Sequence, residues 1–298
     1  MKFYLFSPES VPMNQVLFPT FIKTFEEKGH SFVNSIQDAN IILLDLHTRI
    51  AEYNQSDITY LLKCDKPIVT WDEYDKGGMS NLDWPHPLTE QQLQIFNHIE
   101  NNNVKSVHFC RLLNKTKQYP TNLYPYEKPI LYEDPLCSAD ELFNREFDIV
   151  WIANTAPQRE KLAKALREDG RLRCNIILGA EKIPHHNWIA EHRKGKFFIS
   201  CSAGGYSNEC VQGLFSISAQ LRERNDQLLL HDFDHKNNCF KITSTPTQKE
   251  LDDLVEIVND KEKLYDIYKN GHGFVKTNYS EEAWANYYLS ILHQEGIL

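Results

Sequence analysis

The chain has 298 residues, of which 41% are hydrophobic and 12% aromatic, enough apolar material for the cores of two α/β domains. Its formal net charge of -9 argues against a general nucleic-acid-binding protein, because such proteins carry a basic excess that neutralises phosphates. No apolar run is long enough to span a bilayer, and the apolar start before Pro8 is too short for a signal peptide, so we expect a cytoplasmic protein.

Strands and helices alternate through the first part of the chain. The expected strands are short apolar runs, and the expected helices carry apolar residues three and four positions apart. Strands are expected at residues 2–6, 31–34, 40–47, 66–71 and 104–110, and helices around residues 18–25, 58–62 and 93–99. Strands separated by helices of this length predict right-handed βαβ units and an open parallel sheet.

Between residues 111 and 144 the alternation breaks into a stretch rich in proline and tyrosine, which is typical of a packed connection between domains. The alternation then resumes, with strands expected at residues 147–152, 175–178, 196–199 and 228–230 and a helix at residues 159–166. We therefore expect an N-terminal domain at 1–140, a C-terminal domain at 141–276, and a last helix at 277–298 that packs back across both.

Two helix starts near the C-terminus have clear signals. Thr247 and Glu250 form a capping box before an apolar helical pattern. Ser280 precedes the last helix, whose face is unusually aromatic and must pack against a large surface.

A glycine-containing turn follows the expected strand at 196–199 and spans residues 202–208. Val211, Leu214, Phe215 and Leu221 recur at helical spacing after it, so we expect a helix that begins beside Gly204 and Gly205. Backbone N–H groups and the helix dipole would both point into such a turn, which is how many proteins hold a phosphate. An ordinary turn between a strand and a helix is the other interpretation.

Metal and disulfide sites are not expected. The seven cysteines are scattered, odd in number and lack a CxxC pair, which is typical of reduced thiols packed as small apolar side chains. His185 and His186 are adjacent and do not easily face one site together with His192.

Several motifs in this order resemble the nucleotide-sugar-binding half of GT-B glycosyltransferases. They are the helix QREKLAKAL, the segment HRKGKFFIS that leads into the glycine-rich turn and is preceded by Trp188, the glycine-rich turn itself, the capped helix and the terminal helix that begins at NYS. Together they span about residues 147–295. The pattern KPIVTWDEYDKGG in the first half adds a fainter similarity. The resemblance implies two Rossmann-like domains with parallel sheets facing across a cleft, and a metal-independent transfer of sugar from a nucleotide-diphosphate donor to a glycan or other hydroxyl acceptor.

The resemblance also implies which residues bind the donor, a UDP-, GDP- or TDP-sugar. The matching positions are Asn154, Thr155, Arg159, Lys182, Ser202, Gly204, Gly205, Tyr206, Ser207, Asn208 and Glu209. Arg159 and Lys161 lie inside a helix, where solvated pairs with Glu160 and Glu168 are the alternative. Many retaining members carry a glutamate in the helix after the glycine turn, whereas residues 214–219 contain no acid, so Glu209 at the helix start is the nearest candidate for the ribose.

Candidates for a general base lie where strands of the first domain end. They are Glu9, Asp45, Asp72, Glu73 and Asp75, and the cluster at 72–75 could equally be an ordinary acidic loop. No cofactor and no nucleic-acid partner are expected, the similarity suggests polysaccharide biosynthesis, and it leaves room for peripheral membrane contact. Three alternatives remain for the same two-domain fold: a sugar-nucleotide epimerase, a phosphorylase, and a non-catalytic protein that binds a nucleotide sugar or a partner. The lack of a GxGxxG turn argues against a dinucleotide dehydrogenase.

Overall fold

The structure of the protein is a computed structural model that describes residues 1–6, 19–46, 53–72, 89–110, 123–125, 135–153, 155–179, 185–201, 214–224 and 231–298. These residues form two compact units, and each is described by itself. The first unit lies within Met1–Glu127 and Glu281–Leu298, and the second within Lys128–Asp226 and His231–Ser280. Among the described residues, no helix combines the length and hydropathy needed to cross a bilayer.

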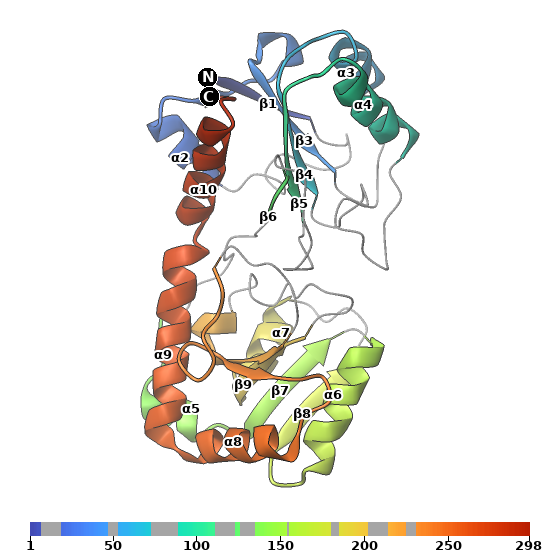
Figure 1. Ribbon diagram of the computed structural model, residues 1–298. Coiled ribbons are helices and arrows are strands. Elements are labelled where there is room, and N and C mark those ends of the chain that lie inside the picture. The colour runs from blue at the N-terminus through green and yellow to red at the C-terminus, as the bar shows by residue number, and fades with distance from the viewer. Residues whose placement is uncertain are drawn as a thin grey trace. The chain divides into compact units, whose positions relative to one another are not determined.

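The first unit is built on a parallel sheet in the order β2-β1-β3-β4-β5-β6 (Figure 1). Its strands are β1 (Lys2–Phe6), β2 (Ser31–Phe32), β3 (Ile41–Asp45), β4 (Ile68–Asp72), β5 (Ser106–Cys110) and β6 (Leu123–Pro125). Its helices are α2 (Pro19–Glu27), the short 3-10 helix η1 (Ile36–Asp38), α3 (Gln55–Leu61), α4 (Glu90–Asn101) and α10 (Glu281–Gln294). All five residues of β3 are buried, as a continuous apolar run in a central parallel strand predicts.

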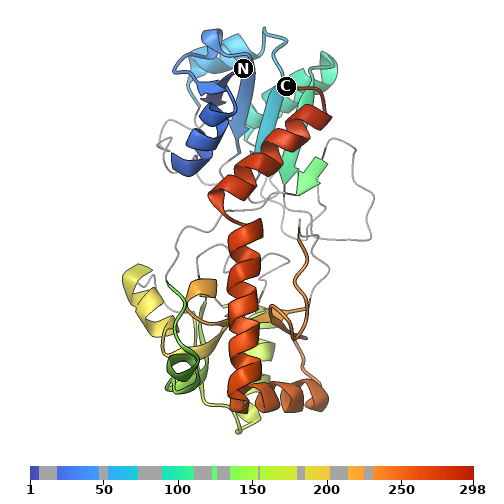
Figure 2. The same cartoon turned by 90° about the vertical axis from the view of Figure 1, so that its left-hand side faces the viewer.

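Each face of this sheet is covered by a pair of helices (Figures 1 and 2). Helices α3 and α4 cover one face, and α2 and α10 cover the other. The aromatic face of α10 packs here, with the ring of Trp284 4.6 Å from Phe21 and 5.6 Å from Trp71 between centroids. The backbone N–H of Thr20 also donates to the carboxylate of Glu281, so the last helix of the chain completes the core of the first unit.

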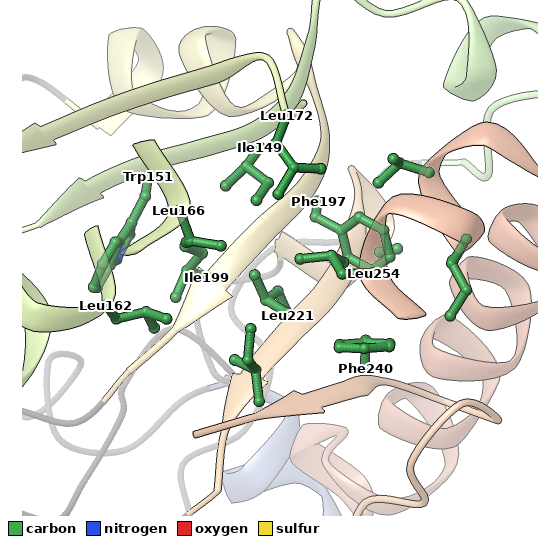
Figure 3. Packing of buried hydrophobic residues seen from close by; sticks show 14 of the residues in the cluster. Ile149, Trp151, Leu162, Leu166, Leu172, Phe197, Ile199, Leu221, Phe240 and Leu254 are labelled. Carbon is green, nitrogen blue, oxygen red and sulfur yellow. The ribbon is translucent and has the colours of Figure 1, made fainter. Parts of the chain in front are cut away.

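The second unit contains a parallel sheet in the order β11-β10-β9-β7-β8. Its strands are β7 (Phe147–Ala153), β8 (Cys174–Leu178), β9 (Gly195–Ser200), β10 (Ala219–Glu223) and β11 (Phe240–Ile242). Its helices are α5 (Ala139–Phe143), α6 (Pro157–Glu168), α7 (His185–His192), the 3-10 helix η3 (Leu214–Ser216), α8 (Gln248–Asn259) and α9 (Lys261–Asn278). Figure 3 shows its core, where side chains of α6 and α8 meet residues of β7, β9, β10 and β11.

The capping box that opens α8 is confirmed. The Thr247 hydroxyl accepts from the Glu250 backbone N–H, and the Glu250 carboxylate accepts from the Thr247 backbone N–H. Both bonds satisfy N–H groups that have no partner inside the helix.

The helix expected to continue to Leu221 is wrong. Leu214–Ser216 form a single 3-10 turn, and Leu221 lies in β10. Strand β10 pairs with β9 and β11, and all five of its residues are buried, so long-range strand pairing overrides the helical spacing.

Several elements, helices α5 and α7 among them, lie where the sequence patterns are silent or misleading. Strand β6 falls inside the expected connector and pairs with β5 through His108 and Leu123. Strand β11 and helix α9 are not marked by the patterns used above. The strand expected at 228–230 lies outside the described residues.

Candidate functional site

The strand order of the second sheet reverses between β7 and β9. From β7, the chain moves to β8 on one side and then to β9 on the other. Open α/β sheets of this kind bind ligands outside the carboxyl ends of the strands at such a switch point. The candidate donor site is therefore the edge where β7 and β9 end, together with the start of α6.

Arg159 connects the two sides of this switch point. It belongs to the first turns of α6, its side chain is buried, and its Nε donates to the carbonyl oxygen of Cys201 at 3.1 Å. The alternative that Arg159 is a solvated surface residue is therefore wrong. Its spacing of three and seven residues from Leu162 and Leu166, which face the core, is the sequence signal for this burial.

Two further polar groups lie at the same edge and were missed from the sequence. The fully buried thiol of Cys201 donates to Oε2 of Glu223, the last residue of β10, at 3.3 Å. Glu223 is itself only 5% exposed, and buried carboxylates are costly unless other groups satisfy them. The sequence signal that could have identified Glu223 is an ionisable residue at the end of a short strand. The ends of β9 and β10 are thus connected by polar contacts at the candidate site.

Thr155 lies beside the end of β8. It is exposed in the short segment between β7 and α6, and a Cβ atom built on Gly179 would come within 2.7 Å of its hydroxyl oxygen. Gly179 has a φ of +74°, which disfavours other residues, and its N–H donates to the carbonyl of Ala153. The structure therefore brings Thr155 close to the exit of the neighbouring strand.

The other predicted donor residues lie outside the described residues. They are Asn154, Lys182, Ser202, Gly204, Gly205, Tyr206, Ser207, Asn208 and Glu209. Of the predicted donor set, the structure thus describes Thr155 and Arg159, both on the segment from the end of β7 into α6.

The first sheet has its own switch point, between β1 and β3. Asp45 is the last residue of β3 and is 7% exposed, so a buried acid lies at this edge. Asp72 ends the neighbouring strand β4, where its backbone pairs with Cys110 of β5. The remaining candidates, Glu9, Glu73 and Asp75, lie outside the described residues.

Of the three histidines considered as metal ligands from the sequence, the structure describes the side chain of His192. His192 is 1% exposed, and its Nδ1 lies 2.9 Å from the carbonyl oxygen of Trp188. Burial lowers the pKa of this imidazole to about 4, so at neutral pH it is an uncharged packing residue. Within the described ranges, no three His, Cys, Asp or Glu residues gather as metal ligands would.

Two parallel-sheet α/β units, each with a switch point of its own, match the GT-B glycosyltransferase fold of similar solved structures. The structure of an α-glucosyltransferase in complex with UDP superimposes on this chain with a TM-score of 0.57 and 10% sequence identity. The superposition covers 98% of this chain and 99% of the α-glucosyltransferase. The structure of Anabaena Alr3699/HepE in complex with UDP and glucose gives a TM-score of 0.54 and 10% sequence identity. That superposition covers 99% of this chain and 100% of Alr3699/HepE.

TarM matches 84% of this chain with a TM-score of 0.53 and 11% identity, and the chain spans 54% of TarM's length. No protein-family model matches the sequence, and no curated protein matches it in sequence. At these identities the similarity establishes the fold and leaves the activity to be argued from the site.

Proposed function

We propose that this protein is a glycosyltransferase that moves a sugar from a nucleotide-diphosphate donor to a hydroxyl acceptor without a metal ion. The observation that carries the proposal is Arg159, a buried cation at the switch point of the second sheet. Negative charge gathers on the diphosphate as the sugar bond breaks, and a fixed cation near that position stabilises the transition state. The similar structures bound to UDP support a nucleotide ligand.

The donor is expected to lie over the ends of β7 and β9. Arg159 would face the diphosphate, and Thr155 would add a hydroxyl donor from the neighbouring exit. We keep Lys182 and the segment from Ser202 to Glu209 as further donor residues. Because residues 214–223 form a 3-10 turn and a strand, the lack of an acid at 214–219 no longer counts against the resemblance. Glu209 therefore remains the candidate for the ribose.

The acceptor side is expected in the first unit. A hydroxyl acceptor must lose a proton as it attacks, and a carboxylate within hydrogen-bond reach can take it. Asp45 is the described candidate whose place in the fold fits best, because it ends β3 at the switch point of that sheet. Glu9, Asp72, Glu73 and Asp75 stay as alternatives for the same role.

We expect a glycan or a small molecule as the acceptor. One of the similar structures is an α-glucosyltransferase in complex with UDP and DNA. The net charge of -9 argues against DNA as the acceptor here, because DNA-binding proteins gain most of their affinity from basic groups on phosphates.

We further propose a cytoplasmic protein that acts in polysaccharide biosynthesis. Cys64, Cys137, Cys174, Cys201 and Cys239 all carry free thiols, which fits a reducing compartment.

Nucleotide binding is the first test. A ligand at 100 times its dissociation constant adds about 2.7 kcal/mol of stability, so UDP or UDP-glucose should raise the melting temperature measurably. Arg159→Gln should weaken binding more than tenfold, whereas Arg167→Gln is the matched control. Arg167 lies on the same helix and also donates to a backbone carbonyl, that of Ile176, two turns away from the switch point.

If UDP, GDP, TDP and their sugars all leave the melting curve unchanged, the proposal fails. Binding without turnover of any labelled nucleotide sugar would instead favour the non-catalytic binding protein.

A further inference from the structure

Tyr53 contacts both strands at the switch point of the first sheet. Its ring stacks on Phe6, the last residue of β1, with 5.0 Å between ring centroids and an interplanar angle of 27°. Its hydroxyl donates to the backbone carbonyl of Asp45, the last residue of β3, at 2.7 Å. One side chain therefore joins the two strand ends between which the order of the sheet reverses.

Helix α4 holds Tyr53 in this position. Gln92 is fully buried, and its Nε2 donates to the Tyr53 hydroxyl at 2.9 Å. The Oε1 atom of Gln92 accepts from the backbone N–H of Thr89, which is part of the capping box that starts α4. Next to it, Oε1 of Gln91 accepts from the backbone N–H of Tyr53 at 3.1 Å. The hydroxyl and the backbone of Tyr53 are thus both bonded to the first turn of one helix.

These polar groups are packed among apolar side chains on one face of the sheet. Tyr53 is 4% exposed and packs in the cluster that includes Leu44, Ile58 and Ile95. A phenylalanine would fill nearly the same volume there, and buried polar groups must all be satisfied to avoid a penalty. The chain of bonds from Gln92 through Tyr53 to Asp45 instead fixes one direction for the end of β3.

We propose that Tyr53 and Gln92 are positioning residues that orient Asp45 for its role on the acceptor side of sugar transfer. The inference rests on the proposed function and adds two residues that act through Asp45. Small displacements of a reacting group carry a large penalty in rate, so loss of this support should reduce turnover while the donor site in the other unit keeps its affinity.

The test compares Tyr53→Phe with Tyr4→Phe. Each variant removes one hydroxyl from the same unit. Tyr4 lies on β1, and its hydroxyl donates to the carboxylate of Asp57 at 2.7 Å and not to Asp45. The measurements are the rate of UDP-glucose hydrolysis, with water as the acceptor, and the dissociation constant for UDP. We expect Tyr53→Phe to lower the rate about tenfold or more with an unchanged constant for UDP, and Tyr4→Phe to change neither.

Gln92→Glu separates this role from helix capping. A glutamate keeps an oxygen that can accept from Thr89 but loses the N–H that donates to Tyr53. We expect Gln92→Glu to lower the hydrolysis rate as Tyr53→Phe does, with α4 still folded by circular dichroism. Normal rates in both variants, or equal losses in Tyr4→Phe, would overturn the inference and leave the proposed function standing. Failure of the unchanged protein to bind any of UDP, GDP, TDP and their sugars would overturn both.

Discussion

The buried ion pair between Asp148 and Lys196 offers a stringent test of how the second unit is held together. Asp148 lies near the start of β7 and Lys196 near the start of β9, with 2.9 Å between Oδ1 and Nζ. Their side chains are 7% and 4% exposed. Arg173 donates to the same carboxylate, and the Lys196 ammonium also donates to the carbonyl of Val258 at the end of α8.

Asp148→Ala should destabilise the second unit strongly. The substitution leaves the ammonium of Lys196 buried beside the Val258 carbonyl and the ring of Phe143, 4.6 Å away, with no carboxylate from Asp148 to balance its charge. Removing one partner of a buried pair costs about 3–5 kcal/mol, because the other charge loses both water and its counterion. For a domain of this size, each kcal/mol shifts the melting temperature by about 2–4 °C, so the expected loss is roughly 6–20 °C.

The assay is thermal unfolding followed by circular dichroism, with urea unfolding as a second measure. Glu168→Ala is the control, because Glu168 forms an exposed pair with Lys164 at 3.7 Å, and such pairs contribute about 0–1 kcal/mol. The double variant Asp148→Ala with Lys196→Met should recover part of the loss, because the buried charge is gone. A loss in Asp148→Ala no larger than that in Glu168→Ala would refute the reasoning.

The pH dependence of the same pair has a definite sign. Burial opposes ionisation of Asp148, but hydrogen bonds from Arg173 and Lys196 outweigh it and hold the pKa of the carboxyl below its ordinary value of 3.8. The stabilisation is therefore fully present above pH 3.8 and is lost as the pH falls through the lower pKa of the folded protein.

Two further predictions concern acid sensitivity and packing. Burial lowers the pKa of His108 and of His192 from 6.5 to about 4, so each should cost on the order of 3 kcal/mol of stability as the pH falls from 6.5 towards 4. Urea unfolding across this pH range should show a shallower decline of the unfolding free energy in His108→Gln or His192→Gln than in the unchanged protein. An unchanged slope would contradict the prediction. Gly271→Ala should lower the urea midpoint, because the new Cβ would lie 2.6 Å from the backbone carbonyl oxygen of Asn238. At Gly273, in the same helix, a new Cβ would meet no atom within 4 Å apart from its own helix backbone, so Gly273→Ala should raise the free energy of unfolding by up to about 1 kcal/mol.

Local sequence signals predicted much of the frame. The run at β3 is buried over its whole length, the capping box at Thr247 opens α8, and the aromatic face of the last helix packs against a large core. Each of these signals lies within one element, where burial periodicity and capping act on neighbouring residues. The two parallel sheets follow from the alternation of such elements along the chain.

The sequence by itself thus determined which segments are strands and helices wherever local preference and burial agree. The tertiary structure decided that Leu221 belongs to a strand, because its pairing partners in β9 and β11 are distant in the chain. It also decided that Arg159 is buried against Cys201 and that Tyr53 joins Phe6 to Asp45, since no local pattern records which polar groups meet. The candidate site depends on such long-range contacts, so Thr155 and Arg159 could be proposed from the sequence, whereas Cys201 and Glu223 became candidates only once the fold was known.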